Sequence, residues 1–188
     1  SLARPDSENI LIVGAGTQGR ALHAAYSAAF PQARFTVWNR TPKNAEAMAA
    51  ELKINVATDL EQAVRAADIV TSATMSTDPL IEGDWLQPGQ HVDLIGAYRP
   101  DMREVDDTAL LRARVFVDSF DTTIGHIGEI NIPLEAGTIA RDHLIADYYD
   151  LSAFTRQSDD EITLFKNGGG AHLDLMTANH ILERWRAR

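Results

Sequence analysis

Three glycines near the start of the chain follow the pattern G-x-G-x-x-G, in the stretch GAGTQG at residues 14–19. With this spacing, Gly14 permits a tight turn, Gly16 lets the backbone approach a bound pyrophosphate, and Gly19 lets a helix pack closely against a strand. An apolar run at residues 9–13 precedes the glycines, and an alanine-rich segment with helical spacing follows them. Because a helix N-terminus offers free N–H groups and partial positive charge to phosphates, the stretch predicts dinucleotide binding rather than a packing-only loop.

The end of the second expected strand carries the residues that choose between nucleotides. Asn39 lies twenty positions after Gly19 and is followed by Arg40 and Thr41. An acidic residue at this place hydrogen-bonds the adenosine ribose of NAD, whereas an arginine pairs with the 2′-phosphate of NADP. We therefore expect NADP(H), with Arg40 as the phosphate clamp and Asn39 and Thr41 as its hydrogen-bonding neighbours. The alternative is NAD(H), with Asn39 bound to the ribose and Arg40 as a solvated loop charge.

The loops after the later strands are expected to surround the nicotinamide, because ligands of open sheets lie beyond the carboxyl ends of the strands. Residues 72–74 are expected to line the nicotinamide ribose, and the small pair at 96–97 to let the ring lie close to the backbone. The stretch NGGG at 167–170 offers a second cluster of N–H groups, although each of these segments is also compatible with a simple turn. The full predicted cofactor-binding set is Gly14, Gly16, Thr17, Gln18, Gly19, Asn39, Arg40, Thr41, Ser72, Ala73, Thr74, Gly96, Ala97, Tyr98, Asn167 and Gly168.

A sheet must position these loops, and strand patterns alternate with helix patterns along the chain. The near-continuous apolar strands are typical of a parallel sheet covered by helices on both faces. The segment 121–150 is expected to be irregular with short helices. The sequence thus predicts one doubly wound, mostly parallel α/β domain of the Rossmann type over residues 1–188. Strands are expected near 9–13, 34–39, 54–57, 68–74, 91–97, 114–120 and 161–166, and helices near 17–30, 42–52, 60–68, 106–114 and 171–186.

Composition limits the classes of partner. The net charge of -10 repels phosphate backbones, so neither nucleic acid nor an anionic membrane is expected as a partner. The chain contains no cysteine and no apolar run of the roughly 20 residues that a membrane span needs, and we expect a cytoplasmic protein. It begins at SLARPDSEN without methionine and soon enters an apolar strand, so we expect a portion of a longer protein.

Other charged residues give weaker indications. Asp118, Asp121 and Glu129 are candidates for holding a substrate ammonium or moving a proton, but a solvated acidic loop is the preferred interpretation. His126 and Glu129 are three residues apart without a third ligand at suitable spacing, and no metal site is expected. Asp174 on the last helix is compatible with facing either the cofactor or solvent.

Seven motifs in order give a family resemblance: VGAGTQGR, VWNRT, ADIVTSAT, GAYRPDMREVD, VFVDS, GEI and EITLFKNGGGAHLDL. Together they resemble the ornithine cyclodeaminase/mu-crystallin family over nearly the whole chain. The resemblance implies an enzyme whose substrate-binding and dimer-forming domain comes mostly from an N-terminal part of the full protein. The catalytic groups would then lie largely outside this chain, the region 168–188 would pack toward that other domain, and the full protein would be a homodimer.

The resemblance also implies a choice of reactions on small amino or imino acids. Members use hydride transfer at a carbon bearing an amino or imino group, either as reductases and dehydrogenases or as cyclodeaminases that recycle NAD. Cyclodeaminases carry an aspartate where this chain aligns Tyr98, and a phenol with an unperturbed pKa near ~10 is a poor general base. We therefore expect an NADPH-dependent reductase of a cyclic or α-imino acid. The alternatives are an ornithine cyclodeaminase and a non-catalytic binding protein for a nucleotide or small ligand.

Overall fold

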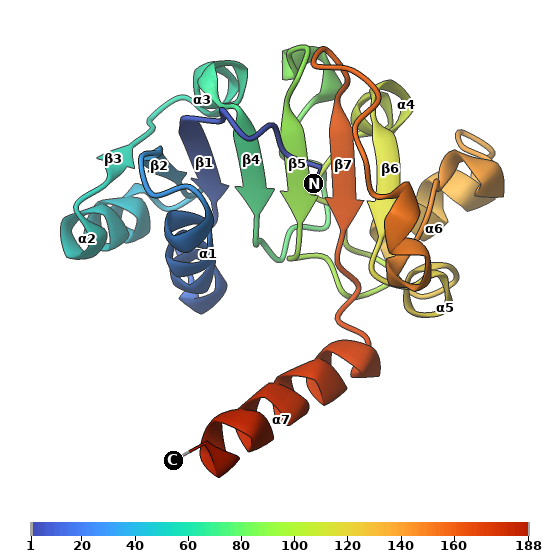
Figure 1. Ribbon diagram of the computed structural model, residues 1–188. Helices are drawn as coiled ribbons and strands as arrows, with labels where there is room; N and C mark the ends of the chain where they lie inside the picture. Colours follow the sequence, from blue (N-terminus) through green and yellow to red (C-terminus); the bar gives the residue numbers. More distant parts are fainter. Residues whose placement is uncertain (1, 188) are drawn as a thin grey trace.

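The computed structural model describes residues 2–187, which contain one sheet of seven parallel strands in the order β3-β2-β1-β4-β5-β7-β6 (Figure 1). In the register of the neighbouring strands β2, β1 and β4, Val13 is level with Trp38 and with Ser72. The carboxyl ends of β1, β2 and β4 therefore meet at one edge of the sheet. The strands are β1 (Asn9–Val13), β2 (Arg34–Trp38), β3 (Asn55–Val56), β4 (Ile69–Ser72), β5 (His91–Leu94), β6 (Arg114–Val117) and β7 (Thr163–Lys166).

Helices cover both faces of this sheet, as the alternation of strand and helix predicts. Asp59 caps one helix by accepting from the N–H of Gln62, and Asp106 caps another by accepting from the N–H of Ala109. The doubly wound α/β fold is thus confirmed. The helices are α1 (Thr17–Ala29), α2 (Pro42–Leu52), α3 (Leu60–Ala66), α4 (Asp107–Arg112), α5 (Phe120–Thr123), α6 (Gly128–Glu135) and α7 (Ala171–Arg186), with short 3-10 turns η1 (Gly83–Trp85), η2 (Arg141–His143) and η3 (Tyr148–Ala153).

The side chains of β1 show how the core is divided. Leu11 and Val13 belong to a cluster that includes Val64 of α3 and Leu110 of α4, whereas alternate residues such as Ile12 belong to a cluster with α2 on the other face. Side chains alternate along a strand, so one apolar run fills both layers. Burial of both faces fixes the strand in register and leaves its carboxyl end as the place where the glycine turn begins.

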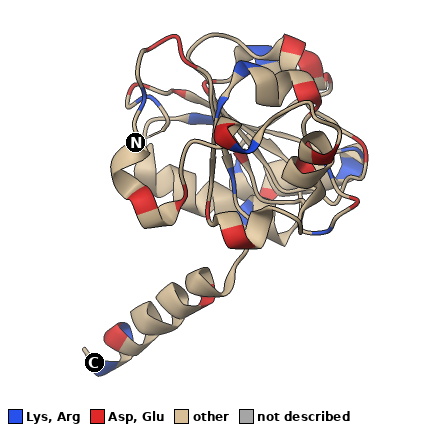
Figure 2. Cartoon of the chain, turned by 90° about the vertical axis from the view of Figure 1, so that its right-hand side faces the viewer, with Lys and Arg blue, Asp and Glu red and all other residues tan. Residues whose placement is uncertain are grey.

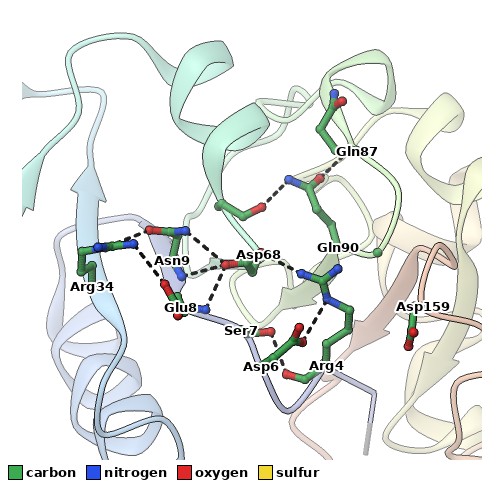
Figure 3. A network of polar contacts seen from close by, with 12 residues as sticks. Arg4, Asp6, Ser7, Glu8, Asn9, Arg34, Asp68, Gln87, Gln90 and Asp159 are labelled. Atoms are coloured by element: carbon green, nitrogen blue, oxygen red, sulfur yellow. Dashed lines mark hydrogen bonds and ion pairs between the residues drawn. The ribbon is translucent and has the colours of Figure 1, made fainter.

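A polar network holds the opposite edge of the sheet (Figure 3). The carboxylate of Asp68, just before β4, accepts hydrogen bonds from the backbone N–H groups of Glu8 at 3.0 Å and Asn9 at 2.9 Å. The same carboxylate pairs with the guanidinium of Arg4 at 3.0 Å. These contacts tie the segment before β1 to the amino end of β4, away from the edge at which the glycine turn lies.

The later part of the sheet has a strand order that the sequence does not specify, and one of its strands is shorter than expected. β7 lies between β5 and β6, so the last strand of the chain is an interior strand. The strand expected at 114–120 ends at Val117, and Phe120 already begins α5. Asp118 is fully buried at this break, where its backbone N–H donates to the carbonyl of Lys166. Pairing partners are non-local, so the apolar pattern of a strand does not specify its neighbours.

The final helix, α7, extends away from the rest of the domain in both views (Figures 1 and 2). Among its residues described by the structure, none is buried, and Leu175 and Trp185 are 62% and 70% exposed. Ala171, Leu175, Ala178 and Leu182 are spaced so that they can share one face of α7, and all four are exposed. Within residues 2–187, no helix is both long and apolar enough to cross a membrane.

A buried histidine predicts how folding stability depends on pH. His91 begins β5, and its Nδ1 lies 2.9 Å from the Thr163 hydroxyl; burial, helped by the charge of Arg156, lowers the pKa of His91 from 6.5 to about 3. Between these values the unfolded chain binds a proton that the native state does not, so stability is lost as the pH falls below 6.5. We expect this histidine to remove about 2 kcal/mol of unfolding free energy between pH 7 and pH 5.

Urea unfolding at both pH values would measure this effect. His91→Gln keeps a polar side chain but cannot titrate, so its unfolding free energy should depend on pH less steeply than that of the wild type. Identical pH dependence in the two proteins would show that His91 binds no extra proton on unfolding.

Candidate functional site

A cleft of about 470 Å³ opens at the carboxyl ends of β1, β2 and β4. Seven residues of the predicted cofactor set line it: Gly14, Gly16, Asn39, Arg40, Thr41, Ala73 and Thr74. The sequence reasoning did not select the remaining lining residues, although all are close in sequence to selected ones. These are Ala15, Trp38, Asn44, Met75 and Leu80.

The glycine turn has the geometry that its spacing predicts. Gly14 has a φ of +112°, and a Cβ there would lie 2.7 Å from the carbonyl oxygen of Ala73. A Cβ on Gly19 would lie 2.2 Å from the carbonyl oxygen of Gly14. At Gly16, by contrast, no described residue other than its neighbours along the chain comes within 4 Å of the Cβ position. Gly14 and Gly19 are therefore required by packing, whereas Gly16 leaves open space beside the backbone.

The N-terminus of α1 faces the cleft without a competing group. Gly16 is its N-cap, no side chain caps it, and its first turn contains no acidic residue. Thr17 and Gln18 in that turn are exposed. Uncapped N–H groups and the helix dipole attract an anion, so the site suits a phosphate-bearing ligand.

Asn39 braces the two loops that form the cleft. Its Oδ1 accepts from the N–H of Ala15 at 3.0 Å, and its Nδ2 donates to the carbonyl of Thr41 at 3.0 Å. Both ends of the amide are thus occupied by the protein. Arg40, between these anchors, is exposed at the wall of the cleft, and in the described part of the chain its guanidinium makes no ion pair. The arrangement presents a positive charge on a fixed loop.

The residues expected near the nicotinamide are arranged differently from the prediction. Ser72 and Ala97 are buried and do not line the cleft, and Tyr98 is 58% exposed beyond it. Gly96 packs against backbone, because a Cβ there would lie 2.0 Å from the carbonyl oxygen of Thr74. Gly96 and Ala97 are therefore small because the loops after β4 and β5 pack closely there. They do not form an open surface for the nicotinamide ring.

The group that joins these loops is Glu104, which sequence reasoning missed. Its carboxylate is fully buried and accepts from the hydroxyl of Ser72 at 2.6 Å and the N–H of Thr74 at 2.8 Å. It also accepts from the N–H groups of Gly96 at 2.7 Å and Ala97 at 3.1 Å. The only local signal is an acidic residue beside the apolar Val105, which does not reveal where the carboxylate points.

The glycine stretch before α7 is also occupied within the protein. The N–H groups of Gly168 and Gly170 donate to Asp118 at 2.8 and 3.4 Å. Asn167 lines a separate cavity of about 740 Å³ on one face of β5 and β7, with Asp93 and Tyr26. Neither residue 167 nor 168 lines the cleft at the glycine turn. Among the described residues, the lining of this larger cavity includes the carboxylate of Asp93 and no lysine or arginine, so it does not suit a phosphate.

The preferred interpretation of the acidic cluster as a solvated loop was wrong for two of its members. Asp118 and Glu129 are fully buried, while Asp121 is exposed. Burial raises the pKa of Glu129 to about 7, opposed by the nearby charge of Lys166. Lys166 is itself fully buried, donates to the carbonyl of Leu94 at 3.2 Å, and has its pKa lowered by burial. The attraction between these two groups offsets only part of the cost of burying them.

The other polar candidates also have defined places. Asp174 is exposed on α7, and His126 is exposed in the loop before α6. His172 lies with its Nε2 3.6 Å from Asp118. Neither Asp174 nor His126 lines the cleft.

The glycine turn, the order of the motifs and the strand order together point to a known group of proteins. The profile of the ornithine cyclodeaminase/mu-crystallin family matches residues 1–188. The chain belongs to this family. Among proteins of known description, a Delta(1)-pyrroline-2-carboxylate reductase of Paracoccus denitrificans is 52% identical over 189 residues, covering 96% of this chain and 60% of the relative.

Two solved structures are also similar to this chain over most of its length. A Thermococcus litoralis Delta(1)-pyrroline-2-carboxylate reductase in complex with NADH and L-proline has a TM-score of 0.87 and 31% identity, over 95% of this chain and 58% of that chain. An archaeal alanine dehydrogenase dimer with bound NAD has a TM-score of 0.89 and 28% identity, over 97% and 58%. This chain thus spans about 60% of the length of the relatives that it matches.

Proposed function

We propose that this chain is the dinucleotide-binding domain of an NADPH-preferring reductase that acts on a cyclic or α-imino acid. The proposal rests mainly on one observation: Gly16, at the N-terminus of α1 that no side chain caps, and the exposed Arg40 line the same cleft. The likeness to pyrroline-2-carboxylate reductases supports the reaction class. The chain spans about 60% of these relatives, so the activity is proposed for the full-length protein.

The residues present fit the proposed cofactor. The open space beside Gly16 and the N–H groups of the first turn of α1 would hold the pyrophosphate, and Ala73 and Thr74 would line the path toward the nicotinamide. When bound, NADPH supplies the hydride that reduces a C=N bond. The role of this chain in the reaction would be to bind and orient the cofactor. Fixing that orientation lowers the entropic part of the activation barrier for hydride transfer.

The preference for NADPH rests on the loop after β2. Asn39 uses both ends of its amide to brace the backbone, which favours a structural role over ribose recognition. Arg40 lies at the cleft wall and makes no ion pair within residues 2–187, so its guanidinium suits a 2′-phosphate. NAD(H) remains the alternative cofactor, and relatives of this chain have been solved with NADH and NAD.

We also propose that the full-length protein is a cytoplasmic homodimer whose α7 packs against the portion outside this chain. The archaeal alanine dehydrogenase is described as a dimer. The exposed apolar side chains of α7, including Leu175, Ile181 and Trp185, would be covered by such packing. The substrate would be a small amino or imino acid, and the Thermococcus litoralis reductase was solved in complex with L-proline.

Assays of the full-length protein would test the reaction. With NADPH and pyrroline-2-carboxylate or piperideine-2-carboxylate, we expect oxidation of the cofactor coupled to formation of the cyclic amino acid. Absence of turnover with both compounds would contradict the proposal. Proline and ammonia formed from ornithine with catalytic NAD would instead identify a cyclodeaminase, for which Tyr98 is unsuited as a general base.

Binding and activity measurements on the same full-length protein would also distinguish an enzyme from a non-catalytic binding protein. Tight NADPH binding without activity on a wide panel of imines and amino acids would identify a binding protein.

A further inference from the structure

The buried carboxylate of Glu104 joins two strand-end loops. Its Oε1 accepts from Ser72 and from the N–H and hydroxyl of Thr74, at 2.6, 2.8 and 2.9 Å. Its Oε2 accepts from the N–H groups of Gly96 and Ala97, at 2.7 and 3.1 Å. One oxygen therefore holds the loop after β4, and the other holds the loop after β5.

This bridge lies directly behind the wall of the cleft. Thr74 lines the cleft, whereas Glu104 does not and is fully buried. The two loops touch closely, because a Cβ on Gly96 would lie 2.0 Å from the carbonyl oxygen of Thr74 and 2.6 Å from Oε1 of Glu104. Any change in the spacing of the loops would move the backbone and side chain of Thr74 at the cleft surface.

The hydrogen bonds require a group that only accepts. All five contacts to Glu104 come from N–H or O–H donors, so an ionised carboxylate satisfies every one. A glutamine in the same place would direct its NH₂ group at donors on one of the two loops. The buried ammonium of Lys166 supplies a compensating charge nearby.

The backbone of Glu104 is held as firmly as its side chain. Glu129 of α6 accepts from the N–H of Glu104 at 2.7 Å and from the N–H of Val105 at 3.1 Å. The carboxylate is thus fixed from behind by α6 and cannot follow the loops if they move apart. Such a buried, fully satisfied network gives one defined arrangement.

We propose that Glu104 is a positioning residue that sets the spacing of the loops after β4 and β5 and thereby orients the nicotinamide half of the bound cofactor. The proposal rests on the proposed function. On this proposal the cofactor site has two parts. The glycine turn and Arg40 bind the adenosine half of the cofactor, and Glu104 holds in place the loops that line the nicotinamide half. Loss of the carboxylate should disturb only the second part.

Binding assays with the whole cofactor and with its adenosine half distinguish the nicotinamide end of the site from the adenosine end. In the full-length protein, Glu104→Gln should weaken NADPH about 10-fold, while adenosine 2′,5′-bisphosphate, which carries only the adenosine end, should change less than about 2-fold. The value of kcat should also fall about 10-fold or more. Glu61→Gln, which changes an exposed glutamate on α3, is the matched control and should alter none of these quantities.

A second variant keeps the test decisive if Glu104→Gln does not fold. Ser72→Ala removes one donor to Oε1 and leaves the charge in place, so it should change NADPH binding in the same direction by a smaller factor. Equal effects on NADPH and on the bisphosphate, or no effect on either in a folded variant, would overturn the proposal. If the wild type itself binds neither ligand, the proposed function fails instead.

Discussion

Gly19→Ala is expected to destabilise the domain by about 3 kcal/mol or more and to reduce cofactor binding with it. A Cβ at this position would lie 2.2 Å from the carbonyl oxygen of Gly14, which is backbone and cannot rotate away. The first turn of α1 would have to move off β1, and the Gly14 turn would move with it. Urea unfolding monitored by circular dichroism would measure the loss.

Gly16→Ala provides the matched comparison, because the two glycines lie in the same turn. Apart from its neighbours along the chain, no described residue comes within 4 Å of the Cβ position at Gly16, and its φ of -86° is accessible to alanine. The unfolding free energy should therefore change by less than about 0.5 kcal/mol. A methyl group there would nevertheless fill the space proposed for the pyrophosphate, and NADPH affinity should fall about 100-fold. Undiminished affinity in this stable variant would place the phosphates elsewhere.

The glycine turn could be predicted from sequence because its requirements are local. Gly14, Gly16 and Gly19 lie within six residues, and the contacts that exclude a side chain at Gly19 come from the same turn. Similarly, the alternation of apolar residues in β1 predicts burial on both faces, since each side chain direction follows from its position in the strand. Arg40 was also predictable, because its place follows from the end of β2.

The nicotinamide end could not be predicted in the same way, because its geometry depends on distant partners. Glu104 is 32 residues from Ser72 in sequence, and the hydrogen bond between them depends on the pairing of β4 with β5. The burial of Asp118 likewise depends on β7 entering the sheet beside β6, which brings Gly168 to its carboxylate. An acidic residue in a loop gives no sign of such burial, so a solvated loop was the natural interpretation.

Arg40→Ala is expected to weaken NADPH about 30-fold while changing NADH affinity less than about 2-fold. The guanidinium is exposed at the cleft wall, on a loop fixed by the two hydrogen bonds of Asn39. A 2′-phosphate can accept charge-assisted hydrogen bonds from it, whereas the ribose of NADH offers no charge to pair with. Isothermal titration of both nucleotides with the wild type and the variant would measure the ratio.

Arg65→Ala is the control for a general loss of positive charge, because Arg65 is an exposed arginine on α3 that pairs with Glu61. It should leave both affinities unchanged. Added salt should weaken NADPH binding to the wild type more than to Arg40→Ala, since screening reduces the contribution of an exposed ion pair. Equal losses of NADPH and NADH affinity in Arg40→Ala would mean that Arg40 does not distinguish the two nucleotides. In that case NAD(H) becomes the better-supported cofactor. The result would then favour a cyclodeaminase that recycles NAD over a reductase that consumes NADPH.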